Sequence, residues 1–176
     1  MNDMTPLATV EDWPVYAGSP APEDAQALLD AASANIIDYA GWPIVRRQVE
    51  AQEYDGEGQR VLTLRALAVV SVEEVRVDDA VVTDWRLSRR YGQLQRTSGV
   101  WPDGFGRIEV DYTAGFDPIP PNLVKLCVEL AAKAASVPLD VSSETMDRRT
   151  IRYREAAAVG GLDAAALERY RLGARP

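Results

Sequence analysis

The amino-acid sequence predicts an α+β fold that is mainly α-helical, with a small antiparallel β module inserted between two helices. Apolar residues recur at helical spacing in residues 19–42 and again in residues 121–136. Between them, residues 44–112 hold short runs of alternating apolar and polar residues, separated by residues typical of turns. We therefore expect a core flanked by two smaller parts: an N-terminal arm over 1–18, the core over 19–136, and a linker with a C-terminal helical docking segment over 137–176.

The first long helix is expected to open at Ser19-Pro-Ala-Pro22, because proline is tolerated in a first helical turn, and to end at Gly41. Before it, Thr9 can cap a short helical turn that Pro14 should limit. The apolar residues of the long helix define the face that we expect to be buried: Ala25, Leu28, Leu29, Ala32, Ile36, Tyr39 and Ala40.

The β module is expected to begin with a strand over residues 44–53. Tyr54-Asp-Gly-Glu-Gly58 is typical of a turn, so residues 60–64 are predicted to form the return strand of a hairpin. Further strands are expected at four places: 72–77, 84–87, 93–95 and 106–112.

The helix expected over residues 121–136 is apolar on most of its surface. Its charged side chains form one thin polar stripe, Lys125, Glu129 and Lys133, each four residues from the next, which favours an i,i+4 ladder. A helix with so narrow a polar face needs cover on nearly every other side. We expect a neighbouring subunit to provide that cover, which indicates an assembly component and not an enzyme.

Composition argues against several classes of site. The net charge is −8 and histidine is absent, so Ser-His-Asp and Cys-His catalytic arrangements are impossible. An acidic chain is poorly suited to non-specific binding of nucleic acid, which needs cationic surface. The single cysteine, Cys127, cannot form an internal disulfide, and its apolar neighbours indicate a core residue. We expect no catalytic residue, no cofactor, no metal, no membrane span and no secretion signal.

Two groups of residues leave two interpretations open. The first is a set of carboxylates that could form a carboxylate-only metal or acid–base site, or simply a solvated strand end and hairpin, which we favour: Glu73, Glu74, Asp78, Asp79 and Asp84. The second is a set of tryptophans that could be interface anchors or core residues: Trp13, Trp85 and Trp101.

The C-terminal part carries the only basic run of the chain, residues 147–154, followed by a last helix expected over residues 163–172. The run could dock on an acidic protein or touch DNA phosphate, or it could be the solvated face of a helix. Because the rest of the chain is acidic, this run makes the molecule bipolar, which suits head-to-tail packing of copies in a ring.

The order of parts resembles a known family. The segment Ile-Glu-Val-Asp-Tyr-Thr-Ala-Gly-Phe-Asp-Pro-Ile-Pro-Pro121, followed by an alanine-rich helix, is the most similar, and the likeness extends over residues 7–136. In this order the chain resembles the head-to-tail connector (adaptor) family of long-tailed bacteriophages and related prophages or gene transfer agents.

This resemblance implies a non-enzymatic virion protein, made in the bacterial cytoplasm and located in the neck of the particle. Family members form a ring, usually a dodecamer, below the portal protein; the ring extends the DNA channel and meets the stopper or tail-completion protein. DNA passes through the channel without specific binding. Because the C-terminal segment of the family commonly reaches the portal, the resemblance implies portal or inter-subunit contacts for six residues: Arg148, Arg149, Arg152, Tyr153, Arg154 and Tyr170.

Three other functions remain open at this stage. A DNA-binding packaging protein, similar to a small terminase subunit, would use the basic run but needs a helix-turn-helix for which residues 1–43 offer one clear helix. A stopper or tail-completion protein is expected to be dominated by β structure. A small hydrolase would depend on the carboxylates named above. On the adaptor interpretation we expect a monomer or loose oligomer in isolation and a closed ring on the portal.

Overall fold

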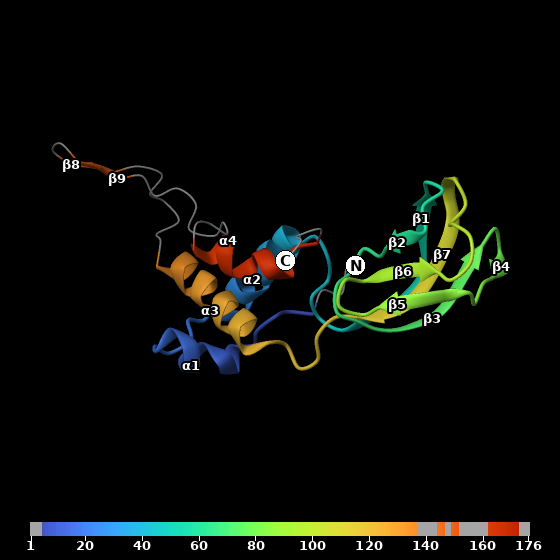
Figure 1. The fold of residues 1–176 in the computed structure, drawn as a ribbon. Helices are drawn as coiled ribbons and strands as arrows, with labels where there is room; N and C mark the ends of the chain where they lie inside the picture. Colours follow the sequence, from blue (N-terminus) through green and yellow to red (C-terminus); the bar gives the residue numbers. More distant parts are fainter. Residues whose placement is uncertain (1–4, 137–143, 147–148, 152–161, 173–176) are drawn as a thin grey trace. The chain divides into compact units, whose positions relative to one another are not determined.

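A computed structural model describes residues 5–136, 144–146, 149–151 and 162–172. The chain divides into two compact units, each with a core of its own (Figure 1). The first, here called the helical unit, contains the chain up to Ala40 together with Ile119–Arg171; the second, the β unit, contains Gly41–Pro118. Each unit is described separately below.

The helical unit begins with two short elements, the 3-10 helix η1 (Val10–Asp12) and α1 (Trp13–Ala17). Thr9 stands at the N-cap of η1 as expected, and its backbone N–H donates to Asp12 Oδ2 at 2.8 Å. The expectation that Pro14 limits this turn was wrong. Pro14 lies in the first turn of α1, where the missing N–H leaves no helical hydrogen bond unmade, so the chain stays helical as far as Ala17.

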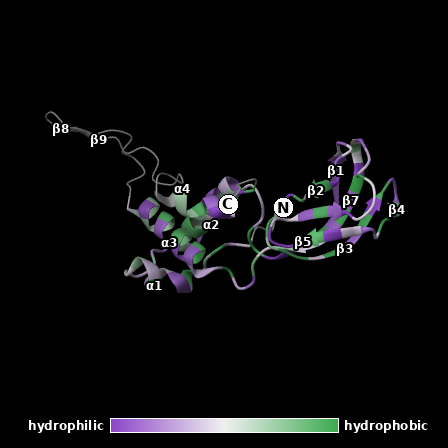
Figure 2. Cartoon of the chain, viewed as in Figure 1, coloured by the Kyte–Doolittle hydropathy of each residue, from purple (hydrophilic) through white to green (hydrophobic). Residues whose placement is uncertain are grey.

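Two longer helices form the centre of the helical unit: α2 (Ala25–Ala40) and α3 (Pro121–Ala135). A C-terminal α4 (Leu162–Leu167) and the 3-10 helix η2 (Glu168–Tyr170) complete it. The helix α2 begins after the Ser19–Pro22 segment, not within it, and Gly41, with φ +77°, follows its last residue. Figure 2 shows hydrophobic residues gathered where α2 and α3 meet.

The apolar surface of α3 is buried within the chain itself. Its buried residues are Leu123, Leu126, Cys127, Val128, Leu130 and Ala131. They are covered because α2, α1 and η1 all pack against α3. The expectation that a neighbouring subunit must cover this helix was therefore wrong, since it overlooked the cover that the short N-terminal helices provide.

Cys127 joins a small polar group inside the helical core. Its Sγ lies 3.3 Å from Ser33 Oγ, and Ser33 Oγ also accepts the backbone N–H of Leu7 at 2.9 Å. The core interpretation of this cysteine is confirmed, because its side chain is fully buried. Burial raises the pKa of the Cys127 thiol to about 11.

We expect Cys127 to resist alkylation in the folded chain and to react on unfolding. The thiolate is the nucleophile, and at pH 8 a pKa near 11 leaves about one thiol in a thousand ionised. Because the folded pKa is raised, the buried thiol contributes stability below its ordinary pKa, and this contribution declines as pH rises from about 9 towards 11. Iodoacetamide labelling followed by mass spectrometry, with and without urea, measures both states. Rapid labelling without urea would contradict the buried position.

The β unit contains two antiparallel sheets (Figure 1). The larger sheet has the strand order β1-β7-β3-β4, and the smaller has the order β2-β6-β5. The strands of the larger sheet are β1 (Arg47–Gly56), β7 (Gly104–Ala114), β3 (Val69–Val77) and β4 (Ala80–Val81). Those of the smaller sheet are β2 (Val61–Thr63), β6 (Gln93–Arg96) and β5 (Trp85–Ser88).

These sheets correct the predicted fold class. The described residues form sheets of four, three and two strands and four α-helices, two of them only one or two turns long, so the fold is β-rich and not mainly α-helical. The predicted hairpin of residues 44–53 and 60–64 was also wrong. The strand β1 pairs with β7, whereas β2 pairs with β6. The predicted turn at Tyr54–Gly58 begins later than expected, because β1 continues to Gly56; residues 57–60 lead the chain from one sheet to the other.

The core of the β unit is centred on β7, whose side chains alternate between buried and partly exposed as predicted. Its buried residues are Ile108, Val110, Tyr112 and Ala114. Two tyrosines link strands inside this core: Tyr54 Oη donates to Tyr112 Oη at 3.3 Å and accepts the backbone N–H of Arg65 at 3.0 Å. Burial, followed by the hydrogen bond with Tyr112, raises the pKa of Tyr54, which stays protonated at neutral pH.

The structure separates the three tryptophans, which could have been interface anchors or core residues, into two buried residues and one half-buried residue. Trp13 in the helical unit and Trp101 in the β unit are 2% and 0% exposed, so both are core residues of the single chain. Trp85 is half-buried on β5, with its Nε1 donating to Val82 O at 3.0 Å.

Candidate interaction surface

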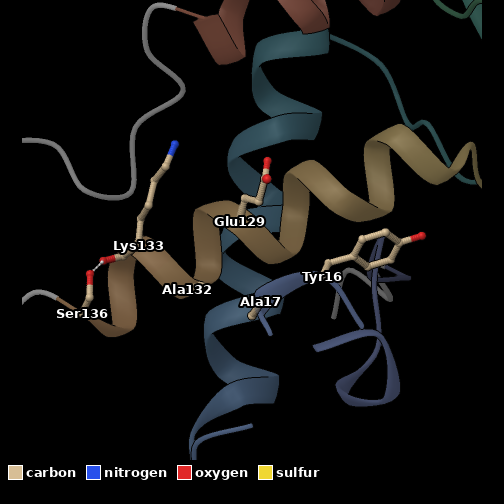
Figure 3. A pocket seen from close by; sticks show the side chains of 6 residues that line it. All are labelled: Tyr16, Ala17, Glu129, Ala132, Lys133 and Ser136. Atoms are coloured by element: carbon tan, nitrogen blue, oxygen red, sulfur yellow. Dashed lines mark hydrogen bonds between the residues drawn. The ribbon is translucent and has the colours of Figure 1, made fainter. Parts of the chain in front are cut away.

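The charged stripe of α3 lies on the outer surface of the helical unit. Lys125 Nζ is 3.8 Å from Glu129 Oε1; the Lys125 side chain is exposed and that of Glu129 is partly exposed. An exposed i,i+4 pair of this kind contributes only about 0.3–0.5 kcal/mol. Glu129 and Lys133 project from the same side of α3 (Figure 3). The stripe thus places alternating positive and negative side chains on the surface of the helical unit, and it adds little to the stability of the chain.

An open pocket of about 400 Å³ lies beside this stripe, between α1 and the C-terminal turns of α3 (Figure 3). Its lining residues are Tyr16, Ala17, Glu129, Ala132, Lys133 and Ser136. Ser136 Oγ donates to Lys133 O at 2.8 Å, so this hydroxyl closes the end of the helix. The mixed lining offers two alanine methyl groups, an aromatic ring and two opposite charges, which suits contact with a protein segment better than catalysis.

Glu129 and Lys133 were expected from the sequence to share a polar stripe, whereas their neighbour Tyr16 was not expected. The only signal that could have placed it was the capped turn at Thr9, because a helix continuing through Pro14 brings Tyr16 beside α3.

The C-terminal elements α4 and η2 are tied to the helical unit by specific contacts. Leu167 is fully buried, and α4 packs against α2. Tyr170 Oη donates to Asn122 Oδ1 at 3.1 Å, at the start of α3. Tyr39 Oη donates to Glu168 Oε2 at 3.1 Å, and burial together with this hydrogen bond raises the pKa of Tyr39. The described side chains of residues 165–171 therefore share one surface with α2 and α3.

The basic run cannot be assembled into a site from the described residues. The backbone of Arg149 belongs to β9 (Arg149–Ile151), which pairs antiparallel with β8 (Glu144–Met146). At this position the chain is a strand, and not the helix face that we considered. The other expected contact residues of the run lie outside the described residues: Arg148, Arg152, Tyr153 and Arg154. Their role stays a prediction.

The carboxylates of the β unit are distributed over separate partners. Glu74 pairs with Arg76 at 3.1 Å, and Asp84 pairs with Arg96 at 3.0 Å. Asp78 pairs with Arg107, whose hydrogen bonds lower the pKa of that carboxyl. Over the part of the chain that the structure describes, no group of three or more His, Cys, Asp and Glu residues is placed to hold a metal ion. Asp78 and Asp79 form the two-residue β3–β4 turn, both with positive φ, as a type I′ hairpin requires.

Among the helices that the structure describes, none is long and apolar enough to span a membrane.

Comparison with known proteins identifies the family. The fold, a helical unit joined to a β unit of two antiparallel sheets, is that of chains in solved particle necks. A chain of "Neck of empty GTA particle computed with C6 symmetry" is 24% identical, with a TM-score of 0.56, and the match covers 98% of this chain and 94% of that one. A chain of "Neck of native GTA particle computed with C12 symmetry" is 22% identical, with a TM-score of 0.55, and both chains are covered completely.

A third similar chain comes from "Virion of native gene transfer agent (GTA) particle", with 24% identity, a TM-score of 0.52, and coverage of 88% of this chain and 83% of that one. A search among curated proteins found no match. The family model described as "Head completion protein" matches residues 6–135. The chain therefore belongs to the head completion protein family, consistent with the connector resemblance noted in its sequence.

Proposed function

We propose that this chain is a structural subunit of a ring in the neck of a tailed phage or gene transfer agent particle, where it acts as the adaptor between the portal and the tail. The observation that carries the proposal is the family match over residues 6–135, which includes most of the helical unit and all of the β unit's strands. The similarity to chains of GTA necks, solved with sixfold and twelvefold symmetry, supports a ring of about twelve copies.

The charge of the chain fits a channel that DNA passes through. With a net charge of −8, copies arranged around a bore repel the phosphate backbone, so DNA can slide without sticking. Each contact between neighbouring subunits can be weak, because many contacts to one portal act together through high effective concentration.

We further propose that the C-terminal segment, residues 137–176, docks on the portal. Tyr170 and Glu168 support this role because they hold α4 and η2 beside α2 and α3, so that one composite surface faces the partner. The arginines at 148, 149, 152 and 154 would supply charge-assisted hydrogen bonds to acidic groups of the portal.

A stopper or tail-completion protein is the second candidate function. The observation that favours it is the β-rich fold, because we expected such proteins to be dominated by β structure. A DNA-binding packaging protein is less well supported. Within the described residues, the N-terminal part up to Ala40 holds one long helix, α2, preceded by the short η1 and α1.

Co-elution with the portal encoded in the same gene cluster tests the adaptor role. We expect the chain and the portal to elute together from a size-exclusion column, and the chain alone to elute as a monomer or small oligomer. Separate elution of the chain and the portal would contradict the adaptor role and favour the stopper role. A gel shift with a steep salt dependence would instead favour DNA binding.

A further inference from the structure

One aromatic side chain of the β unit is almost completely exposed. Phe105 is 91% exposed, more than any other large hydrophobic residue that the structure describes. It lies at the start of β7, where Gly104 is opposite Gly56 and Ile108 is opposite Tyr54 of β1, so residues 105–107 interrupt the pairing; residues 103–107 are here called the tip loop. An isolated exposed apolar residue needs no explanation in itself. Phe105 differs because hydrogen bonds and backbone packing fix the position of the segment that carries it.

The tip loop is held in place by hydrogen bonds on both sides of Phe105. The Gly106 N–H donates to Asp55 Oδ1 at 2.8 Å, and Arg107 Nη1 donates to Asp103 O at 2.8 Å. Arg107 Nε also donates to Asp78 Oδ1 at 2.8 Å, which fastens the loop to the β3–β4 turn.

Packing beneath the loop is equally tight. A Cβ added at Gly56 would lie 1.7 Å from Pro102 O, so β1 and the chain before the loop are in backbone contact. The aromatic ring is thus presented on a fixed support, and its burial by a partner would lose little backbone entropy.

The surface around Phe105 is acidic. Four exposed carboxylates belong to the tip loop or to the adjoining end of β1 and its turn: Glu53, Asp55, Glu57 and Asp103. Arg107, a cation of the same segment, already pairs with Asp78. An apolar side chain on a segment that carries several exposed carboxylates is complementary to an apolar pocket with a basic rim.

We propose that Phe105 is an anchor that inserts into an apolar pocket, rimmed by lysine or arginine, on a different protein of the neck. The inference rests on the proposed function, because it presumes that the chain sits in a neck. A second copy of this chain is disfavoured as the partner. The described pocket of a second copy that contains Lys133 also contains Glu129, so its rim is not basic. DNA and anionic membranes are disfavoured by the net charge of −8.

Replacing Phe105 with the photo-crosslinking residue p-benzoylphenylalanine, in particles made by the strain that encodes the chain, identifies the partner. We expect a crosslink to a polypeptide other than this chain and the portal. A crosslink between two copies, a crosslink to the portal, or no crosslink in particles that contain the chain overturns the inference. Absence of the chain from purified particles overturns the neck assignment itself, and this inference with it.

A pair of matched substitutions measures the contribution of the ring. Phe105→Ser is expected to lower the yield of tailed particles by at least about tenfold, as the loss of a central aromatic anchor does, while co-elution with the portal is unchanged. Tyr91→Ser is the control, because Tyr91 is also an exposed aromatic residue of the β unit. An equal effect of the two substitutions would contradict a specific role for Phe105.

Tyr91 lies at the opposite end of the unit, which makes the comparison informative. The backbone N–H of Val69 donates to Arg89 O at 3.2 Å, and Val69 pairs with Ala114, so the β5–β6 turn is at the Ala114 end of β7. Phe105 is at the other end of that strand, which has 11 residues and spans about 35 Å at roughly 3.4 Å per residue.

Discussion

Replacing Trp101 with alanine is expected to destabilise the β unit by about 3–5 kcal/mol, as large-to-small substitutions in a packed core do. The Trp101 side chain is fully buried, and its Nε1 donates to Leu94 O at 3.2 Å. The Arg96 guanidinium lies 5.1 Å from the centre of the Trp101 ring. The substitution therefore leaves a cavity and an unpaired carbonyl, and it removes a cation–π contact.

Hydrogen exchange measured by mass spectrometry can report on each unit separately. We expect amides of β7 to lose protection by on the order of 100-fold or more, while amides of α3 change little, because the two units have separate cores. Trp85→Ala is the matched control. Trp85 is half-buried, and its loss is expected to cost less than about 2 kcal/mol. Equal effects of the two substitutions would contradict the central position of Trp101.

Truncation after Ser136 is expected to lower the affinity for the portal by on the order of 100-fold or more, because an interface whose energy is concentrated in few contacts loses them together. The truncation removes the basic run, α4 and η2, including Leu167 and Tyr170. Biolayer interferometry with immobilised portal measures the change. A truncated chain that binds as tightly as the full chain would contradict the docking proposal.

Two further variants separate charge from packing in that segment. Replacing the four arginines at 148, 149, 152 and 154 with glutamine keeps the chain length and removes the charge. This variant should bind the portal more weakly than the unchanged chain at low salt, and the difference between the two should disappear at high salt. Tyr170→Phe removes only the hydroxyl that donates to Asn122 Oδ1, and a change of less than about threefold is expected. If only the truncated chain loses affinity for the portal, while the arginine and Tyr170 variants keep theirs, docking is assigned to α4 and η2.

Local patterns in the sequence predicted the elements that local physics determines. The strand β7 and the helix α3 were expected close to their observed bounds, because each has a clear period of two or of 3.6 residues. The glycine at the end of α2 and the capped turn at Thr9 were also predictable from the sequence, since a left-handed backbone conformation and an N-cap depend on a few neighbouring residues.

Features that depend on residues far apart in the chain were not predictable from the sequence. The partner of β1 is β7, far along the chain, and a register shift between Val49 and Gln52 weakens the alternation of β1. This irregularity, and the shortness of β2, β5 and β6, led the sequence interpretation to underestimate the β content. Similarly, the stripe of Lys125, Glu129 and Lys133 was visible, but the pocket beside it requires α1 to lie against α3.

Native mass spectrometry of the chain mixed with its portal is the sharpest test of a portal-bound ring. We expect one species whose mass equals the portal plus about twelve copies of the chain, in keeping with the twelvefold symmetry of a similar neck. We also expect that the chain alone does not form that closed ring. A portal that keeps its own mass in the mixture would rule out the portal-bound ring, as would binding of only one or two copies of the chain.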